Sequence, residues 1–321
     1  MKIALAIEGS NTRGMGHVFR SLLYVQYLKS HNIDFVYLIN DDSKTIDVLK
    51  KNNIDYILVN YSDIKSNWEA DIIHNNGIDV WFNDKFETSL ELERHIHEQN
   101  ILFACLDDVG AGAVEADLYF AGMIYPSLEK PIGKKYYSGT EYVTLNPEID
   151  FYKKKRKKLK RIVISMGGSD PHEVTIDLVK ELKSFDYDID IVIGPNFKKK
   201  RELEMINGGR FHIYQNIPSL IEFFSHYDLA ITGGGVTCCE ANAAGLPCFV
   251  IANAPHEINT GKWLEEMGGC KYLGNYENWS RDILKSINSL ELEKMSIKGM
   301  KNFDTKAIER IFSVIKSEVE K

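Results

Sequence analysis

The 321-residue chain has no long hydrophobic run and no surplus of positive charge. No apolar stretch approaches the ~18 residues that suggest a membrane span, so no integral membrane segment is expected. The formal net charge of −7 argues against nucleic acid as a partner, because a phosphate-binding surface usually carries a basic surplus. The apolar start at residues 3–7 ends at Glu8 and is shorter than the ~7–15 residues of a secretory signal core. We therefore expect a cytoplasmic protein.

The chain also lacks the cysteine spacing of a disulfide or zinc framework. Its five cysteines include no CxxC pair, and two of them are adjacent: Cys105, Cys238, Cys239, Cys248 and Cys270. The HExxT segment that begins at His256 lacks the second histidine of a zinc protease. We therefore expect buried, reduced thiols, no metal site and no cofactor.

Short β-branched runs alternate with longer amphipathic stretches twice along the chain, which is typical of βαβ units and a parallel sheet. In the first half the expected strands cover residues 2–7, 34–38, 56–59, 79–82 and 102–106. In the second half they cover residues 162–165, 189–193, 211–214, 229–232 and 248–251. The pattern predicts an α/β fold of two doubly wound, Rossmann-like domains, whose ligands lie at the carboxyl ends of the strands.

The alternation stops between residues 107 and 150, and an intensely basic run follows at 153–161. A run of this kind is usually a solvated connector. We therefore predict an N-terminal domain over 1–150, a linker over 151–161 and a second domain over 162–302. Apolar residues spaced three and four apart predict a closing amphipathic helix within 303–321.

A glycine-rich corner follows the predicted strand at 229–232. Three glycines at 233–235 remove every side chain before the next helix, so that backbone N–H groups and the Thr237 hydroxyl face outward. The corner lacks the lysine of a Walker motif, which favours a nucleoside diphosphate over ATP chemistry. Glu240, one turn into the helix, is placed to accept two hydrogen bonds from a ribose diol, although a solvated glutamate would fit the same position.

His17 stands in the first turn of the first predicted helix, where the helix dipole disfavours a charged imidazole and keeps the ring fit for a general base. A histidine that only packs at the helix start is the alternative. Gly14 and Gly16 before it allow a ligand to approach the backbone. A dinucleotide fingerprint is not matched, because Phe19 stands at the third glycine position.

Other candidates follow strands elsewhere in the chain. Asp108 is a candidate for a sugar hydroxyl, with turn formation as the alternative. Gly167 and Gly168 follow a strand where a ligand would approach, although a small-residue turn explains them as well. Asp170 as N-cap and Pro171 as first helical residue predict the next helix start. Three further candidates open a later helix at the same sheet edge: His256, Glu257 and Asn259.

The segment Gly14-Met-Gly16-His17-Val-Phe-Arg20 resembles the UDP-sugar hydrolases of pseudaminic acid biosynthesis, which act on UDP-2,4-diacetamido-2,4,6-trideoxy-β-L-altropyranose. The resemblance spans about residues 1–270. It also rests on segments that are similar to the family's acidic pair, linker, Gly-Gly-Ser-Asp turn and nucleotide motif: 107–108, 139–148, 165–170 and 233–240.

This resemblance implies a GT-B-like fold, with two Rossmann-like domains facing a central cleft, as in the related undecaprenyl N-acetylglucosaminyltransferase of peptidoglycan synthesis. It implies that His17 activates the water that displaces UDP without a metal, and that Glu240 binds ribose. The residues implied for the diphosphate turn are Gly234, Gly235, Val236 and Thr237. His256 and Glu257 stand where the family has an Asn-Gln pair, and Asn146 replaces an arginine, so the sugar stays open.

The leading hypothesis is therefore a hydrolase that releases UDP from a UDP-linked diacetamido-trideoxy sugar. A GT-B glycosyltransferase that uses a UDP-sugar donor for surface glycan synthesis is the alternative, with His17 activating an acceptor hydroxyl. A binding protein that has lost the chemistry is a third reading, and an NAD oxidoreductase is the weakest. Neither the oligomeric state nor the extent of domain closure follows from the sequence.

Overall fold

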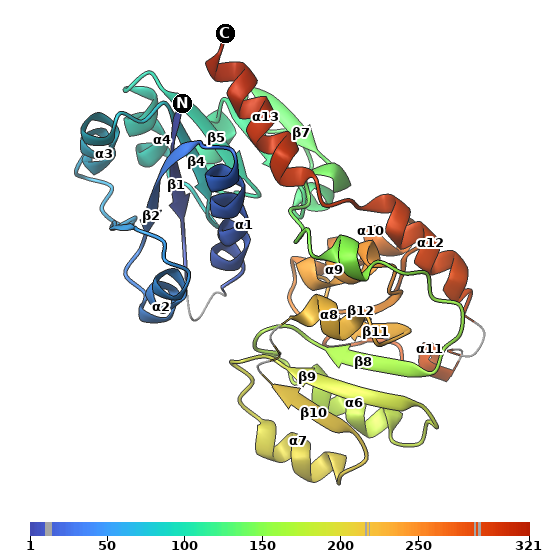
Figure 1. Ribbon diagram of the computed structural model, residues 1–321. Coiled ribbons are helices and arrows are strands. Elements are labelled where there is room, and N and C mark those ends of the chain that lie inside the picture. The colour runs from blue at the N-terminus through green and yellow to red at the C-terminus, as the bar shows by residue number, and fades with distance from the viewer. Residues whose placement is uncertain (10–14, 216, 218, 286, 288–289) are drawn as a thin grey trace. The chain divides into compact units, whose positions relative to one another are not determined.

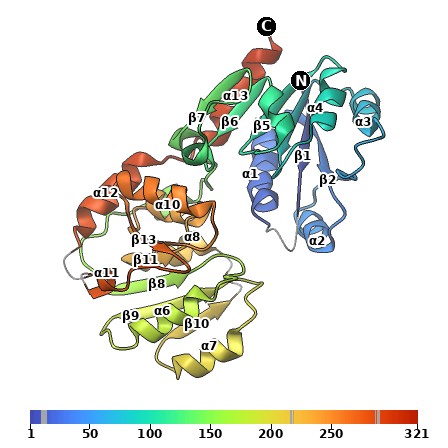
Figure 2. The ribbon, with the colours of Figure 1, turned by 180° about the vertical axis from the view of Figure 1, so that it is seen from behind.

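The computed structural model describes residues 1–9, 15–215, 217, 219–285, 287 and 290–321. These residues form two compact units. Unit 1 comprises Met1–Thr144 and Lys306–Lys321, and unit 2 comprises Leu145–Thr305. Each unit contains a parallel sheet with flanking helices (Figures 1 and 2). The predicted α/β class and the predicted pair of Rossmann-like domains are confirmed.

The sheet of unit 1 has the strand order β3-β2-β1-β4-β5-β6-β7. The strands are β1 Lys2–Ile7, β2 Asp34–Ile39, β3 Ile57–Leu58, β4 Val80–Asp84, β5 Leu102–Leu106, β6 Leu118–Ala121 and β7 Lys135–Ser138. The last two were not predicted, because the segment 107–150 looked irregular. β6 is only four residues long, yet all four are buried and it pairs in register with both β5 and β7.

Helices cover both faces of this sheet. They are α1 Gly16–Ser30, α2 Ser43–Lys51, α3 Trp68–Asn76, α4 Leu90–His97 and α13 Ala307–Val319, with 3-10 turns at Ala111–Glu115, Tyr125–Ser127 and Thr140–Tyr142. Along β1, Ile3, Leu5 and Ile7 pack with α1 and α13, while Ala4 and Ala6 face α3 and α4. This alternation buries β1 on both faces, as expected for a central parallel strand.

The C-terminal helix α13 completes the core of unit 1. The Phe312 ring centroid lies 6.0 Å from that of Tyr24 on α1 and 5.6 Å from that of Phe82 on β4. The chain therefore returns to its first unit at its C-terminal end, and the predicted closing helix packs on the sheet formed by the N-terminal strands.

The sheet of unit 2 has the strand order β10-β9-β8-β11-β12-β13. Its strands are β8 Arg161–Ser165, β9 Asp188–Ile193, β10 His212–Gln215, β11 Leu229–Thr232, β12 Cys248–Ala252 and β13 Cys270–Asn275. Its helices are α5 Ile149–Tyr152, α6 Val174–Leu182, α7 Lys200–Asn207, α8 Leu220–Phe224, α9 Val236–Ala243, α10 Glu257–Glu266, α11 Asp282–Lys285 and α12 Leu292–Asn302. The edge strand β13 was not predicted.

The unit boundary at residues 144 and 145 differs from the predicted linker at 151–161. The basic run is also not wholly solvated, because Arg156 is only 2% exposed. Its guanidinium donates to the backbone carbonyls of Lys154 at 2.6 Å and Tyr227 at 3.2 Å, and also to Ala244. An arginine has five N–H donors, so it can be buried where several carbonyls converge. Part of the basic run therefore belongs to the core of unit 2 and is not a solvated connector.

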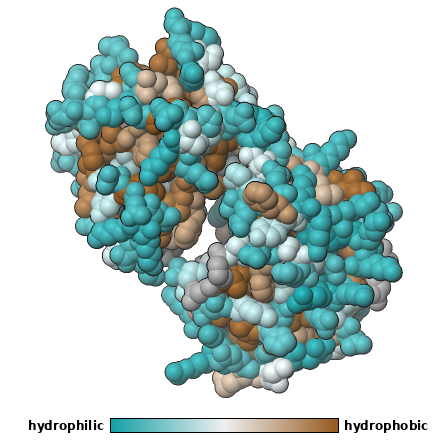
Figure 3. All heavy atoms as spheres, in the orientation of Figure 1, coloured by the Kyte–Doolittle hydropathy of each residue, from teal (hydrophilic) through white to brown (hydrophobic). Residues whose placement is uncertain are grey.

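Figure 3 shows a surface dominated by hydrophilic side chains, with smaller apolar areas between them. The most exposed large apolar residues are Phe151 and Met205, at 86% and 76%. Among the helices that the structure describes, none combines the length and the apolar character needed to cross a membrane.

Candidate active site

Three polar side chains of unit 1 meet where its strands end. Asp84 is the last residue of β4, Asp107 directly follows β5, and His17 is the second residue of α1, which follows β1. β4 pairs with both β1 and β5, and all three strands are parallel. Their carboxyl ends therefore share one sheet edge, which is where ligands of doubly wound folds bind.

His17 and Asp84 form a hydrogen-bonded dyad. The His17 Nδ1 lies 2.5 Å from the Asp84 Oδ1, and the ring packs edge-on against Phe86 with centroids 4.3 Å apart. The Asp84 side chain is fully buried, whereas that of His17 is 12% exposed. An ionised acceptor holds the imidazole proton on Nδ1 and leaves the lone pair on Nε2. No hydrogen bond of Nε2 is recorded among the described residues, so this nitrogen is available as a base.

Arg20, one turn after His17, keeps Asp84 ionised. Its Nε donates to the Asp84 Oδ2 at 2.8 Å, its Nη2 contacts the Oδ1, and its Nη1 donates to the Asp107 Oδ2 at 2.8 Å. Burial of Asp84 opposes its ionisation, but the charge of Arg20 and the hydrogen bonds from His17 and Arg20 outweigh this effect and lower the pKa of Asp84 well below its usual range. Tyr24 adds a hydrogen bond of 2.8 Å to the same carboxylate.

The structure changes the roles assigned to the acidic pair. Asp108 was predicted to bind a ligand, but its carboxylate is fully buried and accepts hydrogen bonds from the backbone N–H groups of Thr88 and Gly110 at 2.9 and 2.8 Å. It therefore holds a turn, which was the alternative. Asp107 instead contacts Arg20, and its Oδ1 accepts from the N–H of Gly122 at 2.9 Å.

Sequence reasoning gave no role to Asp84, because the predicted strand at 79–82 ended before it. Extending that strand to 84 would have placed an acidic residue at the same sheet edge as His17. Of the two glycines predicted beside His17, Gly16 is the first residue of α1, and a Cβ there would meet no atom within 4 Å. Gly14 lies outside the described residues.

In unit 2, the glycine-rich corner leads into an uncapped helix. Gly235 has extended backbone, with φ −86° and ψ −168°, and α9 begins at Val236 with no capping side chain and no acidic residue in its first turn. No partner is recorded in the described structure for the N–H groups of Val236 and Thr237. Unpaired N–H groups at a helix start form a binding site for an anion.

Glu257, the first residue of α10, packs against this corner. Its Oε2 accepts hydrogen bonds from the N–H of Gly234 at 3.0 Å and of Asn253 at 2.7 Å. A Cβ on Gly234 would lie only 2.7 Å from the Glu257 carbonyl oxygen, so the close approach requires glycine. One oxygen of the Glu257 carboxylate therefore holds the corner in shape.

Glu240, the candidate for ribose binding, is also in unit 2. It lies on α9, half-buried, and burial raises the pKa of its carboxyl to about 7. No hydrogen bond or ion pair of this carboxylate is recorded in the part of the chain that the structure describes. A half-buried acceptor that lacks donors is suited to bind hydroxyl groups of a ligand.

The remaining candidates of unit 2 lie at the same edge of its sheet. Gly167 and Gly168 follow β8, are exposed, and would have no atom within 4 Å of an added Cβ. Gly167 has φ +85°, a conformation that favours glycine. His256 and Asn259 are exposed at the start of α10.

Asn253 connects the loops at this edge and was not singled out from the sequence. Its Nδ2 donates to the Met166 carbonyl at 3.3 Å and to the Asp170 Oδ1 at 3.0 Å. Asp170 in turn accepts from the N–H of Val174 and Thr175 at 3.1 and 2.9 Å. It thus caps α6, but the predicted helix start is wrong: α6 begins at Val174, because Asp170 itself has φ +43°.

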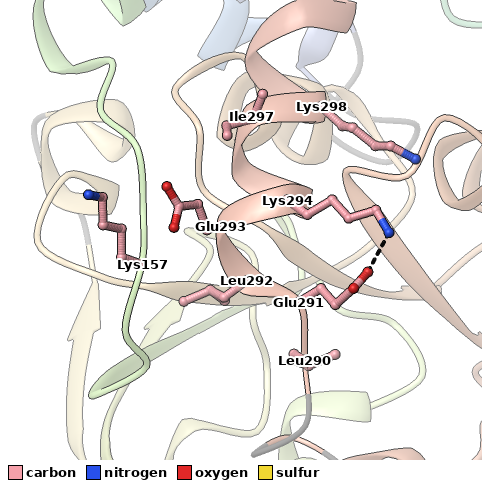
Figure 4. A pocket seen from close by; sticks show the side chains of 8 residues that line it. All are labelled: Lys157, Leu290, Glu291, Leu292, Glu293, Lys294, Ile297 and Lys298. Atoms are coloured by element: carbon pink, nitrogen blue, oxygen red, sulfur yellow. Dashed lines mark hydrogen bonds and ion pairs between the residues drawn. The ribbon is translucent and has the colours of Figure 1, made fainter.

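The structure also contains a hollow of about 550 Å³ in unit 2, away from these loops. Figure 4 shows its lining by Lys157 and by side chains of α12 and the residues just before it, with an ion pair between Lys294 and Glu291. Its lining mixes lysines and glutamates with Leu290, Leu292 and Ile297, so it does not carry a single sign of charge.

No protein-family model matches the chain. The uncharacterized protein MJ1062 of Methanocaldococcus jannaschii is 29% identical over 275 residues, which cover 78% of this chain and 55% of that protein. The chain thus spans about half the length of this relative. The spore coat polysaccharide biosynthesis protein SpsG of Bacillus subtilis is 22% identical over 304 residues, covering 85% of this chain and 84% of SpsG.

Solved structures of other proteins superpose on nearly the whole chain. MurG of Acinetobacter baumannii superposes with a TM-score of 0.70 at 15% identity, covering 98% of this chain and 99% of MurG. MnaA of S. aureus, solved with UDP, gives a TM-score of 0.66 at 16% identity, covering 99% and 97%. The calicheamicin glycosyltransferase CalG4 gives 0.66 at 12% identity, covering 98% and 97%. The fold is GT-B-like. At these identities the likeness establishes the fold and leaves the chemistry to the site residues.

Proposed function

We propose that this chain hydrolyses a UDP-linked diacetamido-trideoxy sugar and releases UDP. The observation that carries the proposal is the His17–Asp84 dyad, because the His17 Nε2 has no hydrogen-bond partner among the described residues and has the chemistry of a general base. The class of sugar comes from the resemblance of the sequence motifs to the hydrolases of pseudaminic acid biosynthesis. SpsG, whose name assigns it to polysaccharide biosynthesis, supports a role in making a surface glycan.

In this proposal unit 1 supplies the base. The water oxygen attacks the anomeric carbon, the carbon–oxygen bond to UDP breaks, and its electron pair leaves with the nucleotide. The proton of the water passes to the His17 Nε2, and the Asp84 carboxylate stabilises the imidazolium that forms. Arg20 acts as a positioning residue, since it holds Asp84 in its ionised state. Attack opposite the leaving group inverts the anomeric centre.

Unit 2 binds the nucleotide in this proposal. The free N–H groups at the start of α9 face the diphosphate, and they stabilise the charge that develops on the departing UDP. Glu240 accepts hydrogen bonds from the two ribose hydroxyls. MnaA, a protein of the same fold, was solved with UDP, which supports a nucleotide diphosphate as the ligand.

The test is release of UDP from UDP-sugars without any acceptor. We expect turnover by the wild-type chain and a loss of about 10²–10⁴-fold in kcat for His17→Gln, since general-base catalysis contributes about this much. His74→Gln is the matched control, because His74 is exposed on α3, outside the dyad. UDP release that needs a sugar acceptor would replace the hydrolase with the glycosyltransferase, which shares the same dyad chemistry.

A further inference from the structure

Three cysteines of unit 2 bring their sulfur atoms together. They are Cys238 on α9, Cys248 at the start of β12 and Cys270 at the start of β13. Their Sγ atoms all lie within 4.8 Å of one another, and the Cys238 and Cys270 sulfurs are 3.4 Å apart. Cys248 and Cys270 are register partners on neighbouring parallel strands. This cluster could not be foreseen from the sequence, because the spacings between the three residues match no common metal motif.

The cluster is closed to solvent. Cys238 and Cys248 are fully buried, and Cys270 is 4% exposed. No further His, Cys, Asp or Glu ligand atom joins the group in the described part of the chain. The donor set is therefore three sulfurs, which select thiophilic ions over the hard cations that prefer oxygen.

Asn242 supplies a second and independent feature. It lies one turn after Cys238 on α9, is 1% exposed, and its Nδ2 donates to the Cys270 Sγ at 3.1 Å and to the Cys248 Sγ at 3.4 Å. Amide donors that face sulfur stabilise thiolates, as the groups around bound metals commonly do. Gly299 leaves room for the amide, because a Cβ there would lie 3.0 Å from the Asn242 Oδ1.

The spacing of the sulfurs fits one ion. A zinc–thiolate bond is about 2.3 Å, so three sulfurs around a common ion lie about 4 Å from one another. The Cys238 and Cys270 sulfurs are somewhat closer than this, at 3.4 Å, and all three sulfurs lie within 4.8 Å of one another, which is the range that one shared ion requires. We propose that Cys238, Cys248 and Cys270 bind one thiophilic d10 cation, Zn²⁺ or Cu⁺.

Binding releases a proton from each thiol that becomes a thiolate ligand. The bound ion ties α9 to β12 and β13 just behind the glycine-rich corner, since Cys238 follows Thr237 directly. The inference does not rest on the proposed function, and its test measures no enzyme activity.

The experiment titrates the metal-free, reduced full-length chain with Zn²⁺ and, in a separate anaerobic arm, with Cu⁺, each against a chromophoric chelator. We expect one ion per chain in one of the two arms. X-ray absorption at the metal edge is expected to report three sulfur neighbours. Cys270→Ser is expected to weaken binding by at least 100-fold, and Asn242→Leu by about 10–100-fold, since it leaves the ligands in place but removes their donor.

Cys105→Ser is the matched control, because Cys105 is equally buried but lies on β5 of unit 1. It is expected to leave affinity and sulfur count unchanged. The proposal is overturned if neither ion competes with the chelator, if fewer than three sulfurs surround the ion, or if Cys105→Ser weakens binding as much as Cys270→Ser. The sulfur count is measured on the wild-type chain, so it decides the question even where a variant fails to fold.

Discussion

At the scale of single residues, the proposed chemistry depends on a carboxylate without access to solvent. Asp84 is fully buried, yet its partners hold it in the charged state. A buried charge is tolerated only where other groups compensate it, and here Arg20, His17 and Tyr24 all contact the same carboxyl group. The same contacts fix the tautomer of the histidine, so stability and catalysis share one hydrogen-bond network.

Asp84→Asn tests this link. The neutral amide no longer favours the Nδ1–H tautomer or stabilises an imidazolium, so kcat for UDP release is expected to fall by about 10²–10⁴-fold with little change in KM. The variant also leaves the Arg20 charge less compensated, and a lower melting temperature is expected. Steady-state kinetics and thermal unfolding are measured together. Asp55→Asn is the control, because Asp55 is exposed on the surface of unit 1. Unchanged kcat in a folded Asp84→Asn would remove the dyad from the mechanism.

The raised pKa of Glu240 predicts how the stability of the chain changes with pH. Its folded-state pKa of about 7 is above the ~4.3 of an unfolded glutamate, so the folded state binds the proton more tightly. The raised pKa therefore increases the free energy of unfolding below pH ~4.3, and this contribution is lost as the pH rises through the folded-state pKa of about 7. Glu240→Gln is expected to stabilise the chain at pH 8 by about 1 kcal/mol or more and to change little at pH 4.

The measurement is denaturant unfolding of Glu240→Gln at both pH values. Glu222→Gln is the matched control, since Glu222 is exposed on the neighbouring helix α8. A residue that costs stability in the empty protein but binds a ligand is expected at a functional site. Equal stabilisation at pH 4 and pH 8 would contradict the raised pKa.

At the scale of elements, the sequence predicted most strands of both sheets, including the edge strands β3 and β10, and missed β6, β7 and β13. The strands at 2–7, 102–106 and 229–232 coincide with β1, β5 and β11, because each is a short buried apolar run. β6 and β7 lie in the irregular segment 107–150, which hid them although β6 is fully buried, and the half-buried residues of β7 and β13 alternate weakly. Periodicity therefore fails both for a four-residue strand within irregular sequence and for a half-buried strand at a sheet edge.

The candidate site was also only partly predictable from the sequence. His17 and the glycine-rich corner stand next to predicted strand ends, so the sequence pointed to them. Asp84 and Asn253 matter through contacts with segments far away in the chain, and only their positions at the ends of β4 and β12 could have marked them. Asp107 and Asp108 are adjacent and chemically identical, yet Asp107 contacts Arg20 while Asp108 holds the turn with Thr88 and Gly110, a difference that the sequence alone does not reveal.

The corner itself gives a prediction about the packing of α9 against α10. Gly234→Ala places a methyl group 2.7 Å from the Glu257 carbonyl oxygen, so the two helix starts must separate. We expect a loss of about 1–3 kcal/mol in stability and weaker UDP binding. Gly168→Ala is the control for stability, because the added methyl meets no atom within 4 Å and the residue has no positive φ. Calorimetric titration with UDP and thermal unfolding report both effects, and tight UDP binding by a folded Gly234→Ala would contradict a corner that requires glycine.

At the scale of the whole molecule, the proposed base and the proposed nucleotide site belong to different units. His17 lies in unit 1, whereas Glu240 and the start of α9 lie in unit 2. Each unit has its own sheet and its own buried core. Two roles that rest on separate cores can be disrupted separately, because a substitution in one core leaves the contacts of the other core in place.

Ligand-induced stabilisation of the full chain tests this separation. A ligand at 100 times its Kd stabilises the folded state by about 2.7 kcal/mol, so UDP is expected to raise the melting temperature of the wild type. His17→Gln is expected to keep this rise and to lose turnover. Glu240→Gln is expected to lose most of the rise, even though the variant without UDP is the more stable protein at pH 8. If His17→Gln abolishes the rise while Glu240→Gln preserves it, then the nucleotide depends on unit 1, and the assignment of binding to the glycine-rich corner is wrong.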